Sequence, residues 1–177
     1  PVAGQAAILA SRGRGARGPD GSARRGLRAL MMLTAARRAT RADAAGDLVR
    51  LVDKDRSTWD AALITEGLTL VEGALQRSQN RVGRFEVQAA ITACHTSAAT
   101  FADTDWSDIV AQYDTLLLIE PTTIVTRHRS LASADRDGPR TGLQASNAVP
   151  GHDAYHLTQQ LRAPLPSLRV PHHRAHT

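Results

Sequence analysis

Three histidines near the C-terminus are the most obvious candidates for chemistry in this sequence. His172, His173 and His176 lie close together, and histidine nitrogens commonly bind divalent metal ions. Three prolines precede them, and no acidic residue or cysteine accompanies them. Such a tail is only a compositional signal, so we predict no physiological metal site there.

Cys94 and His95 are a second candidate, because a thiol and an imidazole can form a nucleophilic pair. They are neighbours in a predicted helix, where consecutive side chains point about 100° apart and do not face each other. We therefore predict that Cys94 is a core residue. The glycine-rich residues 12–18 lack the preceding strand of a phosphate-binding loop. We predict a protein that is not an enzyme and uses no cofactor, metal or small-molecule substrate.

The segment Asp43–Asp60, DAAGDLVRLVDKDRSTWD, contains five aspartates, whereas residues 1–50 contain ten arginines and only three acids. Asp and Gly are typical turn residues, so a solvated connector is one interpretation. At the end of this segment we predict that Ser57 caps a helix, with Asp60 in its first turn. Trp59 is expected to pack on the preceding helix.

Gly46 and Asp47 are the residues that bear on whether this segment is a plain connector or a functional loop. Gly46 permits a turn at positive φ that a residue with a Cβ resists. Asp47 has no structural role that the sequence assigns. It either pairs with a nearby arginine (Arg37, Arg38 or Arg41) or contacts a partner. Ordered loops tend to carry function, which favours the partner contact.

The elements that position these residues are predicted to be helices, because apolar residues recur at helical spacing and no alternating β pattern appears. We expect helices at residues 22–39, 57–78, 84–99, 103–121, 121–135, 139–146 and 153–163. Their lengths and tight turns resemble stacked antiparallel hairpins, so the predicted fold is all-α with a degenerate tetratricopeptide-like repeat. Residues 1–21 are expected to be irregular, 22–163 to form the helical domain, and 164–177 to be a disordered tail.

Several inward faces follow from the same periodicity. In the first helix we expect the core face to contain Leu27, Leu30, Met31 and Thr34. In the third, we expect it to contain Val87, Ala90, Ile91 and Cys94. In the fourth, Thr104 or Asp105 is the expected cap, and the inward residues are Trp106, Ile109, Val110, Tyr113, Leu116 and Leu117. Trp59 and Trp106 are both predicted to be largely buried.

Composition limits the class of protein further. The 177 residues have room for one domain, and with 3% aromatic residues its core must be aliphatic. No apolar run reaches the roughly twenty residues of a membrane span, and the single cysteine excludes an internal disulfide. Both features favour the cytoplasm. Arginine supplies 21 of the 22 basic residues. We attribute that bias to GC-rich coding and not to nucleic-acid binding, because no aromatic residues interleave with the N-terminal arginines.

A family resemblance covers most of the chain, from residue 27 to residue 163. The segment LRALMMLTAARRATRADAAGDLVRLVDKDRSTWDAALITEGL (residues 27–68) resembles the C-terminal region of a group of extracytoplasmic-function RNA polymerase sigma factors. In that group an Asp-Gly-Asp-Leu-type motif follows a Leu/Met-rich helix that ends in Ala-Arg-Arg. Later pieces also resemble the group, namely EVQAAITACH, ADTDWSDIVAQYDTLL and DAYHL. Departures include Ala45 for the first Asp of the motif, His128 for an Asn, and the interruption by Pro164 and Pro166.

The resemblance implies a tetratricopeptide-like extension that regulates transcription initiation through protein contacts. The implied partner-contact residues are Gly46, Asp47, Leu48, Asp55 and Arg56. The implied structural residues are Ser57, Trp59, Asp60, Trp106 and Tyr155. The implied partners are sigma domains and the RNA polymerase core, with DNA contacted only through sigma domains that this chain lacks and with no membrane. We expect a truncated or eroded family member, and the alternative is a free-standing helical-repeat adaptor that binds a peptide or protein.

Overall fold

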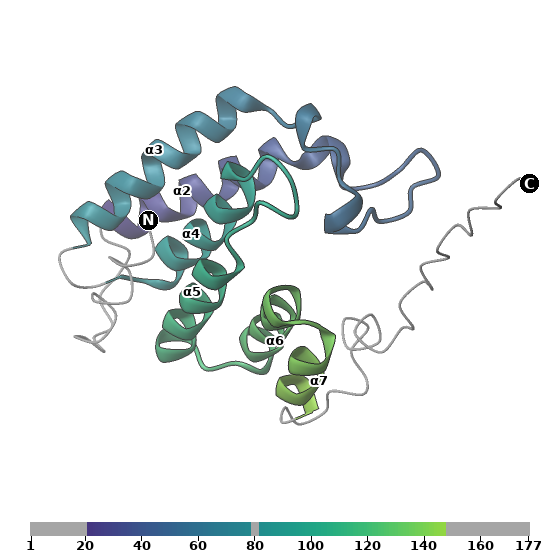
Figure 1. The fold of residues 1–177 in the computed structure, drawn as a ribbon. Coiled ribbons are helices and arrows are strands. Elements are labelled where there is room, and N and C mark those ends of the chain that lie inside the picture. The colour runs from purple at the N-terminus through teal and green to yellow at the C-terminus, as the bar shows by residue number, and fades with distance from the viewer. Residues whose placement is uncertain (1–20, 79–81, 148–177) are drawn as a thin grey trace, which may run out of the picture.

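The computed structural model describes residues 21–78 and 82–147, and this part of the chain is all-α (Figure 1). Its α-helices are α2 (Gly21–Ala36), α3 (Ala61–Arg77), α4 (Arg84–Ser97), α5 (Trp106–Ile119), α6 (Thr123–Asp137) and α7 (Pro139–Asn147). Short 3₁₀ helices lie between α2 and α3, at Arg38–Thr40, Leu51–Asp53 and Arg56–Thr58. The described residues contain no strand, only an isolated bridge between Ala42 and Leu48. The predicted fold class is confirmed.

The helices pack as adjacent antiparallel pairs, α2 with α3, α4 with α5, and α6 with α7 (Figure 1). Helix α2 also packs against α4, and α5 against α6, so each pair is joined to the next. This arrangement is the stack of helical hairpins that the sequence predicts. The connection between α2 and α3 projects from one end of the first pair (Figure 1).

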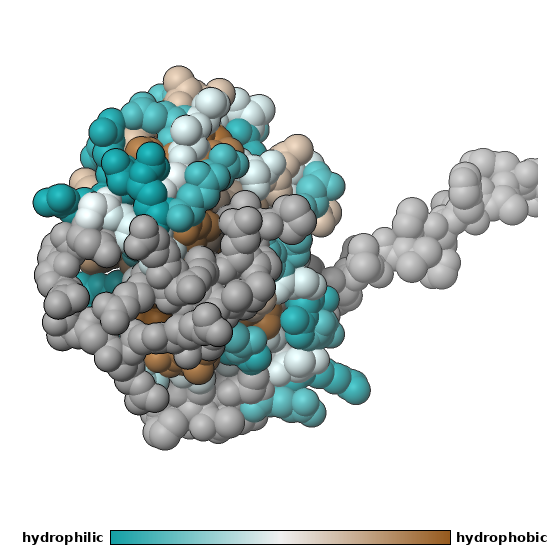
Figure 2. Space-filling view, turned by 90° about the vertical axis from the view of Figure 1, so that its left-hand side faces the viewer, coloured by the Kyte–Doolittle hydropathy of each residue, from teal (hydrophilic) through white to brown (hydrophobic). Residues whose placement is uncertain are grey.

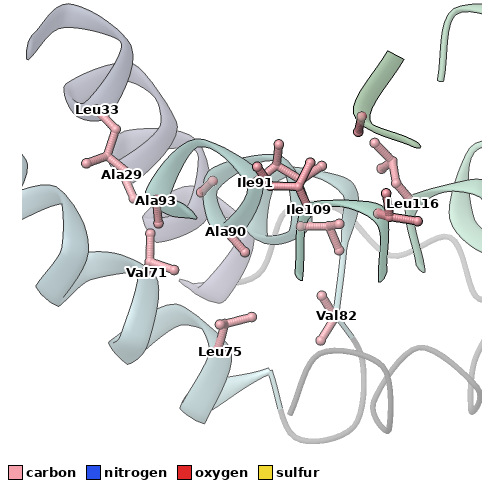
Figure 3. Close-up of a cluster of buried hydrophobic side chains, with 14 of the residues drawn as sticks. Ala29, Leu33, Val71, Leu75, Val82, Ala90, Ile91, Ala93, Ile109 and Leu116 are labelled. Carbon is pink, nitrogen blue, oxygen red and sulfur yellow. The ribbon is translucent and has the colours of Figure 1, made fainter. Parts of the chain in front are cut away.

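Aliphatic and small side chains fill the core, as the shortage of aromatic residues requires. Figure 3 shows Ala29 and Leu33 of α2 close to Val71 of α3 and Ala93 of α4, and all four are buried. On the face shown in Figure 2, hydrophobic residues appear only in small groups between hydrophilic ones.

The predicted inward face of α2 is wrong for Leu27, Met31 and Thr34, whereas Leu30 is partly buried against the core. Met31 is 64% exposed and Leu27 37%, whereas Ala29 and Leu33 are fully buried. Helix α2 approaches its neighbours through a face with small residues. A Cβ on Gly26 would lie 2.8 Å from the backbone nitrogen of Glu86 in α4. Close approach of this kind selects the face with the smallest side chains and leaves larger apolar residues outside.

The inward faces of α4 and α5 are largely as predicted. The fully or nearly fully buried residues include Val87, Ala90, Ile91, Ile109, Val110 and Leu116. Partly buried side chains at their margin are Cys94, Trp106, Tyr113 and Leu117. Trp59 is 6% exposed, so its predicted burial is confirmed, and Trp106 is partly buried against the core, in agreement with its prediction.

Most predicted helix ends agree with the structure, and one does not. Asp105 caps α5 by accepting a hydrogen bond from the Asp108 backbone nitrogen at 2.8 Å, and Pro139 begins α7 as expected. Ser57 does not cap α3. Asp60 does, because its side chain accepts a hydrogen bond from the Leu63 backbone nitrogen at 3.0 Å. Asp60 is therefore the N-cap and not a first-turn residue.

Several predictions fall outside the described residues. These are the helix at residues 153–163 with Tyr155, the tail at 164–177 with its histidines, and nearly all of the segment 1–21. Within the described ranges, each helix is too short or too polar to span a bilayer. In that same part of the chain, no three His, Cys, Asp or Glu side chains are grouped as metal ligands.

Candidate partner-binding site

The connection between α2 and α3, residues 37–60, is closed at its base. The Asp60 backbone nitrogen donates to the Ala36 carbonyl at 3.1 Å, and the Trp59 indole nitrogen donates to Thr40 Oγ1 at 2.8 Å. The Thr40 hydroxyl also contacts the Arg37 carbonyl oxygen at 3.2 Å. These contacts join the end of α2 to the beginning of α3, so the connection leaves and re-enters the helix pair at one place.

An ordered turn forms the tip of the connection, and Asp43 builds it. Asp43 Oδ1 accepts hydrogen bonds from the backbone nitrogens of Ala45 (2.9 Å) and Asp47 (3.0 Å). The Asp43 backbone nitrogen donates to the Asp47 carbonyl at 2.9 Å. Gly46 has φ of 89°, the positive value that its position in the sequence predicts. Asp43 was not among the predicted site residues, although Asp three residues before a turn glycine is a recognisable signal.

Asp47 and Leu48 point their side chains away from this framework. Leu48 is 76% exposed, and Asp47 is also exposed. Asp47 uses its backbone in the turn, but among the described residues its carboxylate has no hydrogen bond or ion pair. The possible pairing of Asp47 with a nearby arginine is therefore absent from this part of the chain, and the turn holds Asp47 and Leu48 in place without using their side chains.

Asp55 and Ser57 form a small capping unit after the tip. Asp55 accepts hydrogen bonds from the Ser57 hydroxyl at 2.6 Å and from the Ser57 backbone nitrogen at 3.0 Å. These bonds favour the charged carboxylate and lower the pKa of Asp55. The side chain of Asp55 thus caps the 3₁₀ helix at Arg56–Thr58.

Arg56 anchors the connection to the end of α4 and to the turn before α5. Its guanidinium donates to the carbonyls of His95 (2.9 Å) and Ala98 (3.0 Å) and to the Thr104 hydroxyl (3.0 Å). These acceptors lie at the end of α4 and in the turn before α5. Of the five residues implied as partner contacts, Asp55 and Arg56 therefore have structural contacts, while Gly46, Asp47 and Leu48 lie together at the tip.

His95 lies under this anchor and is neutral at ordinary pH. Burial, together with the positive charges of Arg37 and Arg56, lowers the pKa of His95 to about 3. Its ring meets the Trp106 ring edge to face, with centroids 5.4 Å apart. Cys94 points elsewhere and contacts Asp108 Oδ2 at 3.5 Å, and burial raises the pKa of its thiol to about 12. The predicted absence of a Cys94–His95 pair is confirmed by these separate surroundings.

A pocket of about 360 Å³ lies beside Cys94, between α3, α4 and the start of α5. Apolar Leu68 and Val71 line one part of it, and the remaining lining includes the acids Glu72, Asp103, Asp105 and Asp108. A thiol with a raised pKa is a poor nucleophile, because the thiolate is the reactive form. The pocket therefore offers space without an activated nucleophile.

The described residues therefore form a stack of helical hairpins, with an ordered and exposed loop at one end of the α2–α3 pair. Residues 2–75, which include this loop, match the model of a family of unknown function, DUF6596. The chain is also 38% identical over 118 residues to an uncharacterized protein of Rhizobium meliloti (strain 1021). That similarity covers 67% of this chain and 27% of the relative, so the chain spans about a quarter of the relative's length. No solved structure matches the chain. Neither match names a sigma factor.

Proposed function

We propose that this chain is a regulatory helical region of a sigma-factor-like protein, acting in the cytoplasm through protein contacts during transcription initiation. One observation carries the proposal. The connection is fixed at its base by Trp59 and anchored by Arg56, yet its tip holds Asp47 and Leu48 outward with no internal use for their side chains. A loop that is rigid and exposes a carboxylate beside an apolar side chain is suited to contact another protein. The sequence resemblance supplies the sigma domains and RNA polymerase core as the partners.

Binding to RNA polymerase tests this proposal directly. The fluorescently labelled full chain is titrated with core polymerase, alone and loaded with an extracytoplasmic-function sigma factor that lacks its own C-terminal region. We expect saturable binding that Asp47→Ala and Leu48→Ala each weaken about tenfold or more, as for central interface residues. The melting temperature should not change. Leu118→Ala is the matched control, because Leu118 is 67% exposed on α5 and lies outside the connection.

Either of two results would refute the proposal: no saturable binding to polymerase in either form, or an equal loss from Leu118→Ala. A second assay uses an intact relative with its sigma domains. There the change equivalent to Asp47→Ala should reduce promoter-dependent transcription while thermal stability stays constant. The sequence shows no helix-turn-helix with a recognition helix that could read base edges, so the chain alone should show no promoter-selective shift in a mobility assay.

A free-standing adaptor is the second candidate, and the outer face of α2 favours it. Met31 and Leu27 are exposed there, although apolar residues on a helix usually face the core. In an adaptor, Met31→Ala would weaken binding to its partner and Asp47→Ala would not. The polymerase titration with these two variants separates the two functions.

A further inference from the structure

Positive side chains gather around Trp59 at the base of the connection. The guanidinium carbons of Arg37 and Arg56 lie 5.4 Å and 5.2 Å from the centroid of the Trp59 ring. The Lys54 ammonium donates to the Thr40 carbonyl, and Thr40 in turn accepts from the Trp59 indole. Arg41 follows directly after the 3₁₀ helix that contains Thr40. Backbone and ring contacts therefore hold several cations in one small region.

In the described part of the chain, no ion pair joins an acid to Arg37, Arg41 or Lys54. The ion pairs found there involve other arginines: Arg28, Arg50, Arg84, Arg129 and Arg136. Burial lowers the pKa of Arg56, and the nearby charge of Asp103 partly offsets that shift. Four of the five aspartates of the connection are used elsewhere, and the exposed carboxylate of Asp47 pairs with none of the described residues. Asp43 builds the turn, Asp53 pairs with Arg50, and Asp55 caps the following 3₁₀ helix. Asp60 caps α3. The acids so close to these cations in the sequence do not neutralise Arg37, Arg41 or Lys54.

Burial and, to a smaller extent, mutual repulsion lower the pKa values of these cations. Burial lowers the pKa of Lys54, and the charges of Arg37 and Arg41 lower it further. Burial and then Arg56 likewise lower the pKa of Arg37. An anion placed among them would offset this repulsion. Binding of an anion would therefore stabilise the charged forms of these side chains.

We propose that Arg37, Arg41 and Lys54 form a receptor for carboxylate side chains of an acidic, partly apolar protein segment. Apolar side chains of the same segment would contact Leu48 and Val52, which are 76% and 50% exposed on the same connection. This proposal names the partner chemistry at the loop and to that extent rests on the proposed function. The cation cluster itself is independent of any transcription role.

Two features favour an acidic protein segment over nucleic acid. A phosphate backbone carries regularly spaced charge, and the nearby Asp43, Asp47 and Asp53 would repel it along its length. A protein segment can place single carboxylates at the cations and apolar side chains elsewhere. The exposed Leu48 and Val52 give such a segment an apolar contact that phosphates do not need.

The test uses the full chain and a short fluorescein-labelled peptide of alternating Asp and Leu. A matched peptide with Asn in place of Asp and a labelled DNA duplex are titrated in parallel. We expect the acidic peptide to bind about tenfold more tightly than the Asn peptide and the duplex. Arg41→Gln and Lys54→Met should each weaken its binding about three- to tenfold, as expected for close charge pairs. Arg24→Gln removes the same charge from an exposed position near the start of α2, so it is the control and should have little effect.

Three outcomes would overturn the inference. The first is failure of the acidic peptide to bind. The second is a loss of binding from Arg24→Gln as large as that from Arg41→Gln, and the third is tighter binding of the duplex through the same residues. The first shows that the cluster is no receptor, the second shows general charge attraction, and the third shows a phosphate site. Peptide binding without polymerase binding would sustain this inference and refute the transcription role. The melting temperature of each variant, measured in parallel, identifies any loss that comes from unfolding.

Discussion

Gly26→Ala should destabilise this protein even though alanine is the better helix former. The added Cβ would lie 2.8 Å from the Glu86 backbone nitrogen and 3.1 Å from its Cα. A backbone atom cannot rotate away, so α2 and α4 must separate. Overpacking of this kind costs about 1–3 kcal/mol, and alanine recovers about 1 kcal/mol of helix propensity. Because the obstacle is backbone, we expect the upper part of that range and a net loss of about 1–2 kcal/mol.

Gly73→Ala is the matched control within the same fold. It also lies inside a helix, α3, but its added Cβ would meet only the end of the Arg77 side chain, at 3.1 Å. That side chain can move, so we expect a gain of about 0.5–1 kcal/mol. Urea unfolding followed by tryptophan fluorescence measures both variants. Equal stabilisation by the two substitutions would refute the claim that Gly26 is required by the close approach of α2 and α4.

Four further substitutions test the connection and the buried histidine. Arg56→Met removes three hydrogen bonds of a charged donor and should lower the unfolding free energy by about 2–3 kcal/mol, whereas a smaller loss in urea titration would argue against an anchoring role. Asp60→Ala should cost about 1 kcal/mol as the true cap of α3, and Ser57→Ala should cost less in the same assay. The folded pKa of His95, about 3, lies below its unfolded value of 6.5, so the unfolded state binds more protons between these values. The unfolding free energy should therefore fall as pH drops from 6.5 toward 3. His95→Phe should reduce the slope of unfolding free energy against pH in this range, measured from unfolding curves at a series of pH values. An unchanged slope would show that His95 is not responsible.

Local signals in the sequence predicted much of the helical framework. Asp105 before an apolar helix and Pro139 after a turn mark helix starts through chemistry that lies within a few residues. The positive φ of Gly46 was predictable for the same reason. The shift from Ser57 to Asp60 as the cap of α3 came from Asp55, which draws Ser57 into a separate 3₁₀ helix. Competing capping residues a few positions apart cannot be ranked from their types alone.

Contacts between distant segments explain which predictions failed and which features were not predicted. The inward face of α2 depends on which side chains are small enough to let α3 and α4 come close. The spacing of apolar residues in the sequence does not include side-chain size at these contacts. The anchoring role of Arg56 depends on carbonyls about forty residues later in the chain. The cation cluster could not be predicted from the sequence, because the neighbouring aspartates suggested that its charges are neutralised. The structure shows that the carboxylates of Asp43, Asp55 and Asp60 accept hydrogen bonds from other groups.

The closed base of the connection has a thermodynamic consequence for any partner. Fixing the backbone of a free residue costs about 1–2 kcal/mol in conformational entropy, and a flexible loop would incur that cost for each residue ordered on binding. Here the Trp59–Thr40 and Asp60–Ala36 hydrogen bonds, together with the Asp43 turn, have ordered the backbone during folding. Association at the tip should then show a small entropic penalty in calorimetry, and Asp43→Ala should increase that penalty without removing any side chain from the contact surface.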